Sequence, residues 1–188
     1  MDVTAFVLSE LPAAPARVLE VGCGAGELAF ALSAAGHAVL AIDPEPPAGP
    51  IFRRSTIEDF DDPQAFDGVV ASRSLHHVAD LALALDRITS VLGPGGIVII
   101  DDFGWERFDA ASADRVGIPL AEWRAEHQHL HPSQVMLGEL NRRFTRRSFS
   151  CEPYLHREER HAVTEAAERR LIENGALPPI GFRYVGSR

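Results

Sequence analysis

Three glycines at alternate positions, Gly22, Gly24 and Gly26, are the residues whose spacing points most directly to a function. An apolar run at 18–21 precedes them, and residues 27–32 follow with helical spacing, so we expect a strand, a tight loop and a helix in this order. Glycine reaches backbone angles that are closed to other residues, and its missing Cβ lets a ligand lie against the main chain. The sequence therefore predicts a ligand-binding loop.

The position of the third glycine helps to decide which ligand such a loop binds. A dinucleotide fingerprint is G-x-G-x-x-G, but here the third glycine comes one residue early and Glu27 stands where the fingerprint requires glycine. A carboxylate at that position is a poor neighbour for a pyrophosphate, although it is harmless beside a cation. The sequence also contains no G-x-x-x-x-G-K-[ST] phosphate loop.

The stretch LEVGCGAG at 19–26 closely resembles the first motif of class I S-adenosylmethionine-dependent methyltransferases. The resemblance is specific from residue 17 to residue 102, about half of the chain. It implies that the ligand is the sulfonium cofactor S-adenosylmethionine, with S-adenosylhomocysteine as the product. The residues of this motif that we expect to bind the cofactor are Glu20, Gly22, Cys23, Gly24 and Gly26.

Asp43 follows the apolar run 38–42, about 20 residues after the glycine loop, where a carboxylate can accept from both hydroxyls of a ribose. The alternative is a solvated aspartate that opens the turn before Pro44. We expect both Asp43 and Pro44 at the cofactor site. The prolines between 44 and 50 predict an extended link to the next strand, which departs from the usual helix of the family.

Two further segments are assigned to the cofactor by the resemblance. Residues 55–60 occupy the adenine-contacting segment, where Thr56 and Ile57 could pack on the purine and Glu58 or Asp59 could accept from its amino group. Residues 72–78 resemble the segment after the fourth strand, and we expect Ser72 and Arg73 of this segment to contact the cofactor.

The candidate catalytic residues are His76, His77 and Asp102. Methyl transfer is an in-line displacement in which the protein mainly aligns nucleophile and methyl group, and a hydroxyl or carbon acid also needs a base. Histidine is the side chain best suited to that task near neutral pH. The alternative is that the histidines pack or contact the cofactor, as histidine often does at this position of the family. We expect Trp105 and residues 123–131 to roof this centre.

Three histidines at alternate positions, His127, His129 and His131, could converge on a metal only if their segment is extended. No carboxylate spacing completes such a site, so we predict no metal. Cys23 and Cys151 are interpreted as small buried residues rather than nucleophiles.

The fold expected from these elements is α/β, a Rossmann-like doubly wound seven-stranded sheet, mostly parallel with an antiparallel last strand and with helices on both faces. Strands are expected at 17–21, 38–42, 51–54, 66–71, 97–100, 149–155 and 181–185, the last at the edge. Helices are expected at 6–11 as a lid across the top of the sheet, at 27–35, from the N-cap Asp80 to the glycine-rich stretch 93–96, and at 164–174.

The 188 residues, of which 46% are hydrophobic and 24% charged, predict a single soluble domain. We expect one methyltransferase domain at 1–188, with a helical substrate-binding insertion at about 103–147. A net charge of -9 argues against nucleic acid as the main partner. The N-terminal residues lack the basic region of a signal peptide, and no apolar run is long enough to span a membrane, so a cytoplasmic location is expected. The sequence leaves the oligomeric state open.

The function predicted is methyl transfer from S-adenosylmethionine to a small-molecule acceptor, at oxygen or carbon. One alternative is a non-catalytic S-adenosylmethionine-binding or partner protein that retains the fold. Another is a nicotinamide-dependent Rossmann enzyme, which Glu27 disfavours.

Overall fold

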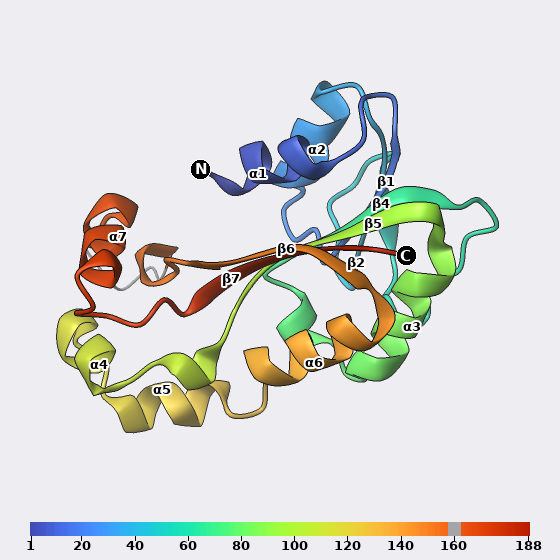
Figure 1. Cartoon of the computed structure of the whole chain (residues 1–188). Helices are drawn as coiled ribbons and strands as arrows, with labels where there is room; N and C mark the ends of the chain where they lie inside the picture. The colour runs from blue at the N-terminus through green and yellow to red at the C-terminus, as the bar shows by residue number, and fades with distance from the viewer. Residues whose placement is uncertain (158–162) are drawn as a thin grey trace.

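The chain folds around one mixed sheet with helices on both faces (Figure 1). A computed structural model describes residues 1–157 and 163–188. Within these residues the sheet has seven strands in the order β3-β2-β1-β4-β5-β7-β6. Their bounds are β1 Arg17–Val21, β2 Ala38–Asp43, β3 Phe52–Arg54, β4 Phe66–Ser72, β5 Leu92–Phe103, β6 Thr145–Glu152 and β7 Gly181–Ser187. The first five strands are parallel and β7 is antiparallel to both its neighbours, which confirms the predicted fold class.

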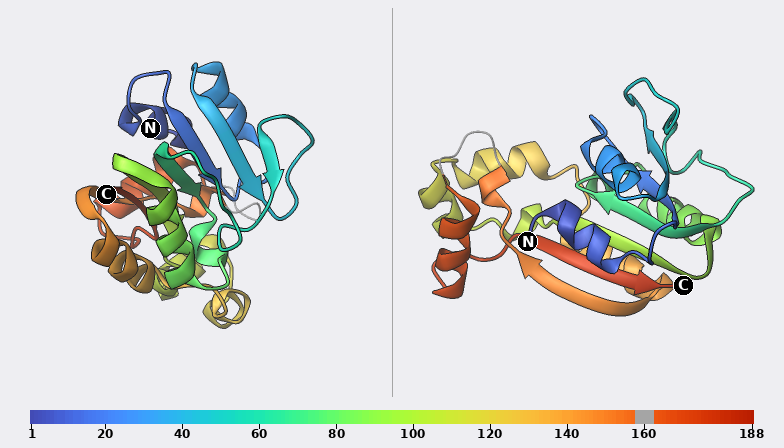
Figure 2. Two further views of the ribbon diagram at one scale, coloured as in Figure 1. Left: turned by 90° about the vertical axis from the view of Figure 1, so that its right-hand side faces the viewer. Right: turned by 90° about the horizontal axis from the view of Figure 1, so that it is seen from above.

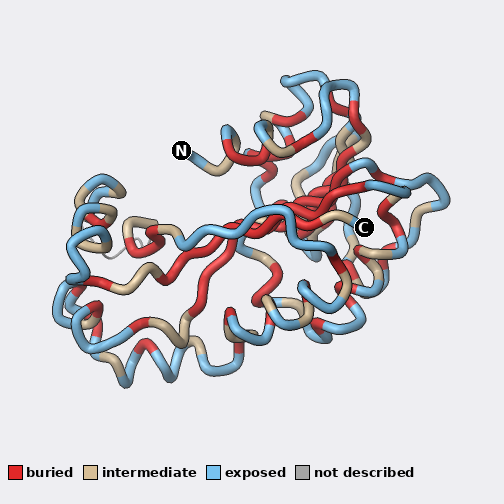
Figure 3. Tube along the Cα trace, in the orientation of Figure 1, coloured by how far each residue is buried: buried red, intermediate tan, exposed pale blue. Residues whose placement is uncertain are grey.

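The central strands are apolar on both sides because helices cover both faces of the sheet. On one face, Ile97 and Ile99 of β5 join a core with α1 (Val3–Glu10) and α2 (Glu27–Ala34). On the other face, Val98 and Ile100 join a core with α3 (Leu81–Val91) and α6 (Ser133–Arg143). The buried centre of the sheet between these layers is visible in Figure 3.

The edge strand next to β5 and β7 differs from the prediction. We expected the last strand at the edge, but β7 lies between β5 and β6, and β6 forms the edge. Six of the seven residues of β7 are buried, whereas β6 is exposed along almost its whole length (Figure 3). The polar sequence of β6 suits an edge, since charged side chains there oppose pairing with another chain. β6 also covers 145–152 rather than the expected 149–155, so residues 153–157 are free to turn toward the end of the sheet.

The glycine-rich stretch after α3 belongs to a strand rather than to a helix end. α3 begins after the N-cap Asp80, as expected, but Leu92 already pairs with Phe66, and the pairing of β4 and β5 shifts between Phe66 and Gly68. Gly95 has a φ of 74° in this irregular stretch. The positive φ of Gly95 therefore lets β5 depart locally from regular pairing with β4.

Helix α1 is part of the wall of the core and does not lie across the top of the sheet. Phe6 and Val7 are buried with residues of β1, β4, β5 and β7, and α1 lies beside α2 in both orientations (Figures 1 and 2). The expectation of a helical lid was therefore wrong. Only residues 1–4 of this region reach the cavity described below.

A third group of helices lies beyond the ends of the strands (Figure 1). It comprises α4 (Ala110–Val116), α5 (Leu120–His127) and α7 (Glu165–Glu173), with the 3₁₀ turns η2 (Trp105–Arg107) and η3 (Leu155–Arg157). Their apolar residues form a separate core around Phe103 and Trp123. The turn η1 (Leu75–His77) connects β4 to the loop before α3. None of the helices in the described part of the chain is long and apolar enough to cross a membrane.

Candidate active site

A cavity of about 1280 Å³ opens at the carboxyl ends of the parallel strands. Its walls come from the ends of β1, β2 and β4, from residues 55–59 and 72–80, and from residues 1–4 and 152–157. Pockets for one small ligand hold roughly 300 to 1,000 Å³, so this cavity has room for a cofactor and an acceptor together. Of the predicted site residues, only Gly26 and Asp102 do not line it.

The three glycines of the loop after β1 have two different roles. Gly22, with a φ of 72°, lies so close to Ser74 that a Cβ would stand 2.3 Å from the Ser74 Cβ. Gly24, with a φ of 50°, has no atom within 4 Å of the position of a Cβ, and it lines the cavity. Gly26 precedes α2, and a Cβ there would meet the ring of Phe52 at 2.5 Å. Gly24 therefore leaves space for a ligand, whereas Gly22 and Gly26 allow the loop to pack.

Glu20, at the end of β1, brings a buried carboxylate to the cavity wall. The residue is 3% exposed, and within the described part of the chain its Oε2 has no hydrogen-bond partner. Burial, only partly offset by a hydrogen bond from the backbone of Ala29, raises the pKa of Glu20 to about 7, and the charge of Asp43 adds to this. An orphaned carboxylate oxygen at a cavity wall suits a ligand that carries positive charge.

Asp43 joins the loops after β1 and β2. Its Oδ2 accepts from the backbone N–H of Gly24 at 2.9 Å, and its Oδ1 accepts from that of Glu45 at 2.8 Å. Each carboxylate oxygen can accept more than one hydrogen bond, so Asp43 can still accept hydrogen bonds from a ligand in the cavity. Burial, together with the charges of Glu20 and Asp43, raises the pKa of the nearby Cys23 to about 11, which keeps this thiol protonated.

The segment 55–59 forms a further part of the wall. Ile57 is buried at 2% exposure, and Thr56 and Asp59 bind each other through the Thr56 hydroxyl. Glu58 Oε1 accepts from the backbone N–H of Ala79 at 2.8 Å, so this carboxylate already holds the loop before α3. Of the two predicted acceptors for an adenine amino group, Asp59 is therefore the less engaged with the backbone.

His76 and Asp102 form a buried pair beside the cavity. His76 Nδ1 lies 2.6 Å from Asp102 Oδ1, and the carboxylate also accepts from the backbone N–H groups of Leu75 and Phe103. Asp102 is 1% exposed and does not reach the cavity, whereas His76 lines it. Since Nδ1 is held by the carboxylate, Nε2 is the ring nitrogen of His76 left for a ligand. Asp102 can act only through His76.

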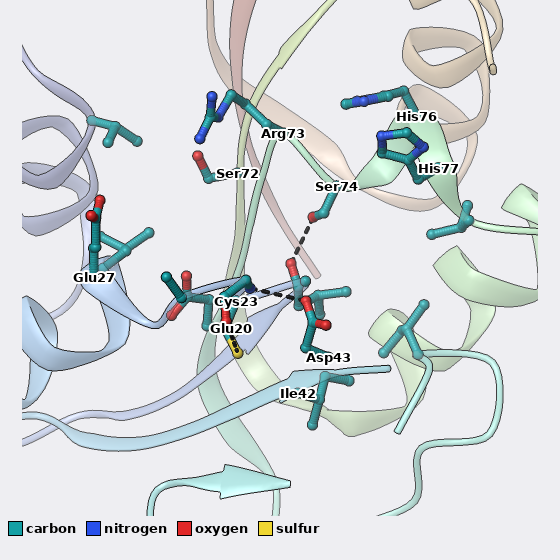
Figure 4. A pocket seen from close by; sticks show the side chains of 18 of the residues that line it. Glu20, Cys23, Glu27, Ile42, Asp43, Ser72, Arg73, Ser74, His76 and His77 are labelled. Atoms are coloured by element: carbon teal, nitrogen blue, oxygen red, sulfur yellow. Dashed lines mark hydrogen bonds between the residues drawn. The ribbon is translucent and has the colours of Figure 1, made fainter. Parts of the chain in front are cut away.

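The neighbours of His76 on the same loop have different environments. The ring of His77 lies 4.1 Å from that of His76, and burial, together with the nearby His76, lowers the pKa of His77. Arg73 has a φ of 52°, the one positive value at a non-glycine residue in the described chain, and it lines the cavity next to Ser72. In Figure 4, Ser72, Arg73 and His76 lie on one side of the drawn pocket and Ile42 and Asp43 on the other.

The wall after β6 was not predicted from the sequence. It presents Tyr154, His156 and Arg157, with Arg183 of β7 beside them. The buried Glu168 of α7 fixes this wall, because it accepts from the backbone N–H groups of residues 154–156 and lies 2.9 Å from His156 Nδ1. The direction of β6 could have indicated that this segment reaches the cavity. β6 and β5 are both antiparallel to β7, so the end of β6 reaches the same edge as the cofactor loops.

The expected roof over the centre was wrong. None of residues 103–147, all of which the structure describes, lines the cavity. Trp123 is fully buried and stacks on Phe108 at 4.3 Å, and Trp105 donates to the backbone of Leu130. These side chains pack on one another because together they make the separate core of the outer helices.

The predicted histidine group lies outside the cavity as well. His127 Nδ1 lies 2.8 Å from the carbonyl of Trp123, and His131 Nε2 lies 2.8 Å from that of Val78. Among the described residues, no group of three or more histidine, cysteine, aspartate and glutamate side chains is placed to hold a metal ion. Cys151 is exposed, contrary to expectation, because it lies on the edge strand β6.

Comparison with known proteins identifies the family that the fold and the cavity suggest. Residues 2–153 match a family described as a methyltransferase domain, and the chain belongs to this family. The ubiquinone biosynthesis O-methyltransferase of Nitrobacter winogradskyi is 32% identical over 151 residues, which are 69% of this chain and 55% of that protein. The chain spans about half the length of the curated relatives that it matches.

Two solved structures share the fold. An S-adenosylmethionine-dependent methyltransferase of Mesorhizobium loti, 19% identical, superposes with a TM-score of 0.67 over 98% of this chain and 96% of its own. The N-methyltransferase NodS of Bradyrhizobium japonicum, in complex with S-adenosylhomocysteine, is 16% identical, with a TM-score of 0.61 over 92% of this chain and 78% of its own. At these identities the likeness concerns the fold.

Proposed function

We propose that this protein transfers a methyl group from S-adenosylmethionine to a small-molecule acceptor. The observation that carries the proposal is the meeting of an open glycine loop, an orphaned buried carboxylate and a histidine–aspartate pair in one cavity. The family membership supports the same reaction class.

The cofactor half of the cavity fits a cationic ribonucleoside. Because Gly24 has no side chain, a ligand can lie against the backbone of this loop. The carboxylate of Asp43, which is next to Gly24, can accept hydrogen bonds from the ribose hydroxyls. Glu20 offers negative charge to the positive end of the ligand. Ile57 supplies an apolar surface for the base. When bound, S-adenosylmethionine supplies a methyl group on a positively charged sulfur.

In the proposed mechanism His76 removes the proton of the acceptor. Asp102 holds Nδ1 and so selects the tautomer whose Nε2 can take a proton from a hydroxyl, and the carboxylate stabilises the imidazolium that results. The buried position of His76 excludes bulk water from this proton transfer. The cavity would then hold the acceptor's oxygen or carbon in line with the bond between the methyl carbon and the sulfur, so that the new bond forms to the methyl carbon as the bond to sulfur breaks.

We favour oxygen as the methylated atom. A base held by a carboxylate is needed for a hydroxyl and not for a neutral amine. The curated relative of Nitrobacter winogradskyi is named an O-methyltransferase, which supports this choice.

His156 is the alternative base, because it also lines the cavity and also pairs with a buried carboxylate, Glu168. The two pairs differ in their surroundings. Both carboxylates also accept from backbone N–H groups, but the side chain of His76 is 4% exposed and that of His156 is 18% exposed. We therefore assign proton removal to His76.

Calorimetry and turnover test the proposal against its two alternatives. S-adenosylmethionine and S-adenosylhomocysteine should bind, and a nicotinamide dinucleotide should not. A library of phenols and catechols, assayed for release of S-adenosylhomocysteine, should contain acceptors that are methylated. Binding without turnover of any acceptor, including carbon acids, would favour a non-catalytic binding protein. His76→Ala should lower the turnover rate by about 10²- to 10⁴-fold, and His129→Ala, on an exposed residue outside the cavity, should leave it unchanged.

We further propose that residues 1–188 act as one methyltransferase domain in the cytoplasm, without a nucleic-acid partner. The net charge of -9 supports the last point. The segment 103–147 has an indirect role in this proposal. The backbone N–H of His131 donates to the carbonyl of His76 at 3.1 Å, so the outer helices support the turn that carries the base.

A further inference from the structure

Charge is unevenly distributed around the cavity. At the ends of β1, β2 and β3 and in the segments that follow them, every charged side chain of the wall is acidic, among them Glu20, Asp43 and Asp59. The arginines of the wall, Arg73, Arg157 and Arg183, all lie on the other side, around the ends of β4, β6 and β7. The acidic side suits the sulfonium of the cofactor, and the basic side suits a carboxylate, either that of the methionine part of the cofactor or that of an acceptor.

Two of these arginines, Arg157 and Arg183, pair with one buried carboxylate, that of Asp101 in β5. Arg157 Nη1 donates to Asp101 Oδ2 at 2.7 Å, and Arg183 Nε donates to Oδ1 at 2.9 Å. The backbone N–H of Arg73 donates to the carbonyl of Asp101 at 2.8 Å, which brings this third arginine to the same place. One carboxylate thus pairs with two guanidinium groups, and a third arginine, Arg73, lines the same cavity next to Asp101 in the backbone.

Two of the three guanidinium groups have donors left for a ligand. Arg183 is committed, since its Nη2 donates to the carbonyl of Met1 and its guanidinium lies 4.5 Å over the ring of Phe6. Arg157 donates through Nη1 to Asp101, and its guanidinium lies 5.9 Å over the ring of Tyr154, but its Nε and Nη2 form no hydrogen bond with any described residue. The side chain of Arg73 forms no hydrogen bond or ion pair with any residue that the structure describes, although its backbone holds a positive φ of 52°.

The acidic residues closest to these arginines are engaged elsewhere. Glu165 pairs with Arg169 at 2.9 Å, and Glu152 accepts from Ser150 Oγ and lies 3.5 Å from Arg169. In the described part of the chain neither carboxylate forms an ion pair with Arg73 or Arg157. Against the effect of burial, Asp101, Tyr154 and Glu165 nevertheless raise the pKa of Arg157. Arg73 and Arg157 therefore line the cavity with donors that these carboxylates do not take, and His156 and His76 line the same cavity.

We propose that the acceptor carries a carboxylate or an equivalent oxyanion, which Arg73 and Arg157 bind while the hydroxyl to be methylated faces His76. This inference rests on the proposed function. Guanidinium groups bind planar carboxylates through two parallel hydrogen bonds, and such charge-assisted contacts are stronger than neutral ones. Arg157 is preorganised for this task because Asp101 fixes one of its nitrogens, whereas no hydrogen bond or ion pair with a described residue fixes the guanidinium of Arg73.

A matched set of acceptors tests the proposal. 3,4-Dihydroxybenzoate, its uncharged amide and 3,4-dihydroxyphenylphosphonate share the catechol and differ in the group that the arginines would meet. We expect the intact protein to prefer the carboxylate to the amide by about 10- to 100-fold in kcat/KM, which is the range for losing one charge-assisted contact. A phosphonate preferred over the carboxylate would identify a tetrahedral oxyanion as the natural group.

Variants of Arg73 and Arg157 test whether these two arginines cause the preference for the carboxylate. Arg73→Gln should reduce the preference for the carboxylate about tenfold or more, with little effect on folding, since the Arg73 side chain forms no hydrogen bond or ion pair with a described residue. Arg157→Gln should do the same, and Arg73→Gln covers the case in which loss of the Asp101 contact unfolds the protein. Arg124→Gln, on an exposed residue of α5 outside the cavity, is the matched control and should retain the preference.

Binding separates this inference from the proposed function. Affinities of the benzoate and the amide for the complex with S-adenosylhomocysteine, measured by NMR titration, do not require turnover. Equal affinities for the two compounds, or a preference that survives in both arginine variants, would overturn the inference even if methyl transfer occurs. Preferential binding of the benzoate that depends on Arg73, without any turnover, would support the anion site and contradict the proposed reaction.

Discussion

The 2.6 Å contact between His76 Nδ1 and Asp102 Oδ1 joins a residue of the cavity wall to one that never reaches it. Asp102 is buried, and its remaining acceptor capacity is taken by backbone N–H groups of the same turn and strand. The orientation of the imidazole is therefore set by the sheet. A base that is held in this way needs no reorganisation when the acceptor arrives.

Asp102→Asn should lower kcat about 10²- to 10⁴-fold while leaving the affinity for S-adenosylhomocysteine unchanged. The amide keeps the volume of the side chain but can donate to Nδ1 and so favours the wrong tautomer. Stopped-flow or steady-state rates, together with calorimetric cofactor binding, measure the two effects. If rate and cofactor affinity fell in parallel, the pair would instead be a structural part of the cofactor site.

Asp43→Ala should weaken cofactor binding by roughly 1.5 to 3 kcal/mol, because charged hydrogen bonds to the ribose are lost. Part of the loss comes from the loop, since Asp43 also holds the backbone N–H groups of Gly24 and Glu45. Asp43→Asn separates these contributions, because an amide oxygen can keep one backbone contact. Calorimetry with S-adenosylhomocysteine gives the affinities. A normal affinity in the folded alanine variant would remove Asp43 from the site.

Gly24→Val should abolish cofactor binding in a protein that still folds. The position of its Cβ is open to the cavity, so the cost to folding is limited to the strain of a positive φ, about 1 to 2 kcal/mol. Gly117→Val is a matched control, since Gly117 has a φ of 72° and open space around it but lies outside this cavity. Comparable thermal shifts with loss of binding only in the Gly24 variant are expected. Undiminished binding by Gly24→Val would mean that the ligand does not approach the loop.

Glu20→Gln should stabilise the ligand-free protein at pH 8 and weaken cofactor binding there. The folded pKa of Glu20, about 7, lies above its ordinary value of 4.5. Its contribution to stability is therefore complete below pH 4.5 and is lost as the pH rises through 7, whereas glutamine does not titrate. Urea unfolding should show nearly equal stabilities of the two proteins at pH 4.5 and a gap of up to about 3 kcal/mol at pH 8.

The cofactor affinity of the wild-type protein should change with pH in the opposite sense. The carboxylate attracts a cationic ligand only when ionised, so the affinity for S-adenosylmethionine should fall as the pH drops below about 7, and Glu20→Gln should flatten this profile. A glutamine variant that is less stable than wild type at pH 8 would show that the charge of Glu20 is compensated in the free protein.

The cofactor half of the site was predictable because its signals are local. Gly22, Gly24 and Asp43 follow directly after apolar runs of strand length, and parallel strands must end at one edge. The predicted strand at 17–21 agrees with β1 to the residue. His76 and Asp102 were both named as candidate catalytic residues, and they lie close together because the neighbouring strands β4 and β5 end at the same edge of the sheet.

The acceptor half depends on contacts between residues far apart in the sequence. Glu168 lies within a helix, and nothing in its neighbours indicates that its carboxylate will hold residues 154–156. Trp123 was expected in the roof as an apolar wall, but it stacks on Phe108 and donates to the backbone carbonyl of Trp105, and so lies in a separate core. Such choices depend on packing that a single sequence does not specify.

Asp101 and Asp102 are consecutive in β5, so their side chains leave opposite faces of the sheet. One carboxylate gathers the arginines on the side of α1, and the other orients His76 beside η1. A deletion or insertion of one residue in β5 would exchange the two and disable both together. Recognition of the acceptor and activation of its hydroxyl would thus be inherited as one unit, fixed by the register of a single strand.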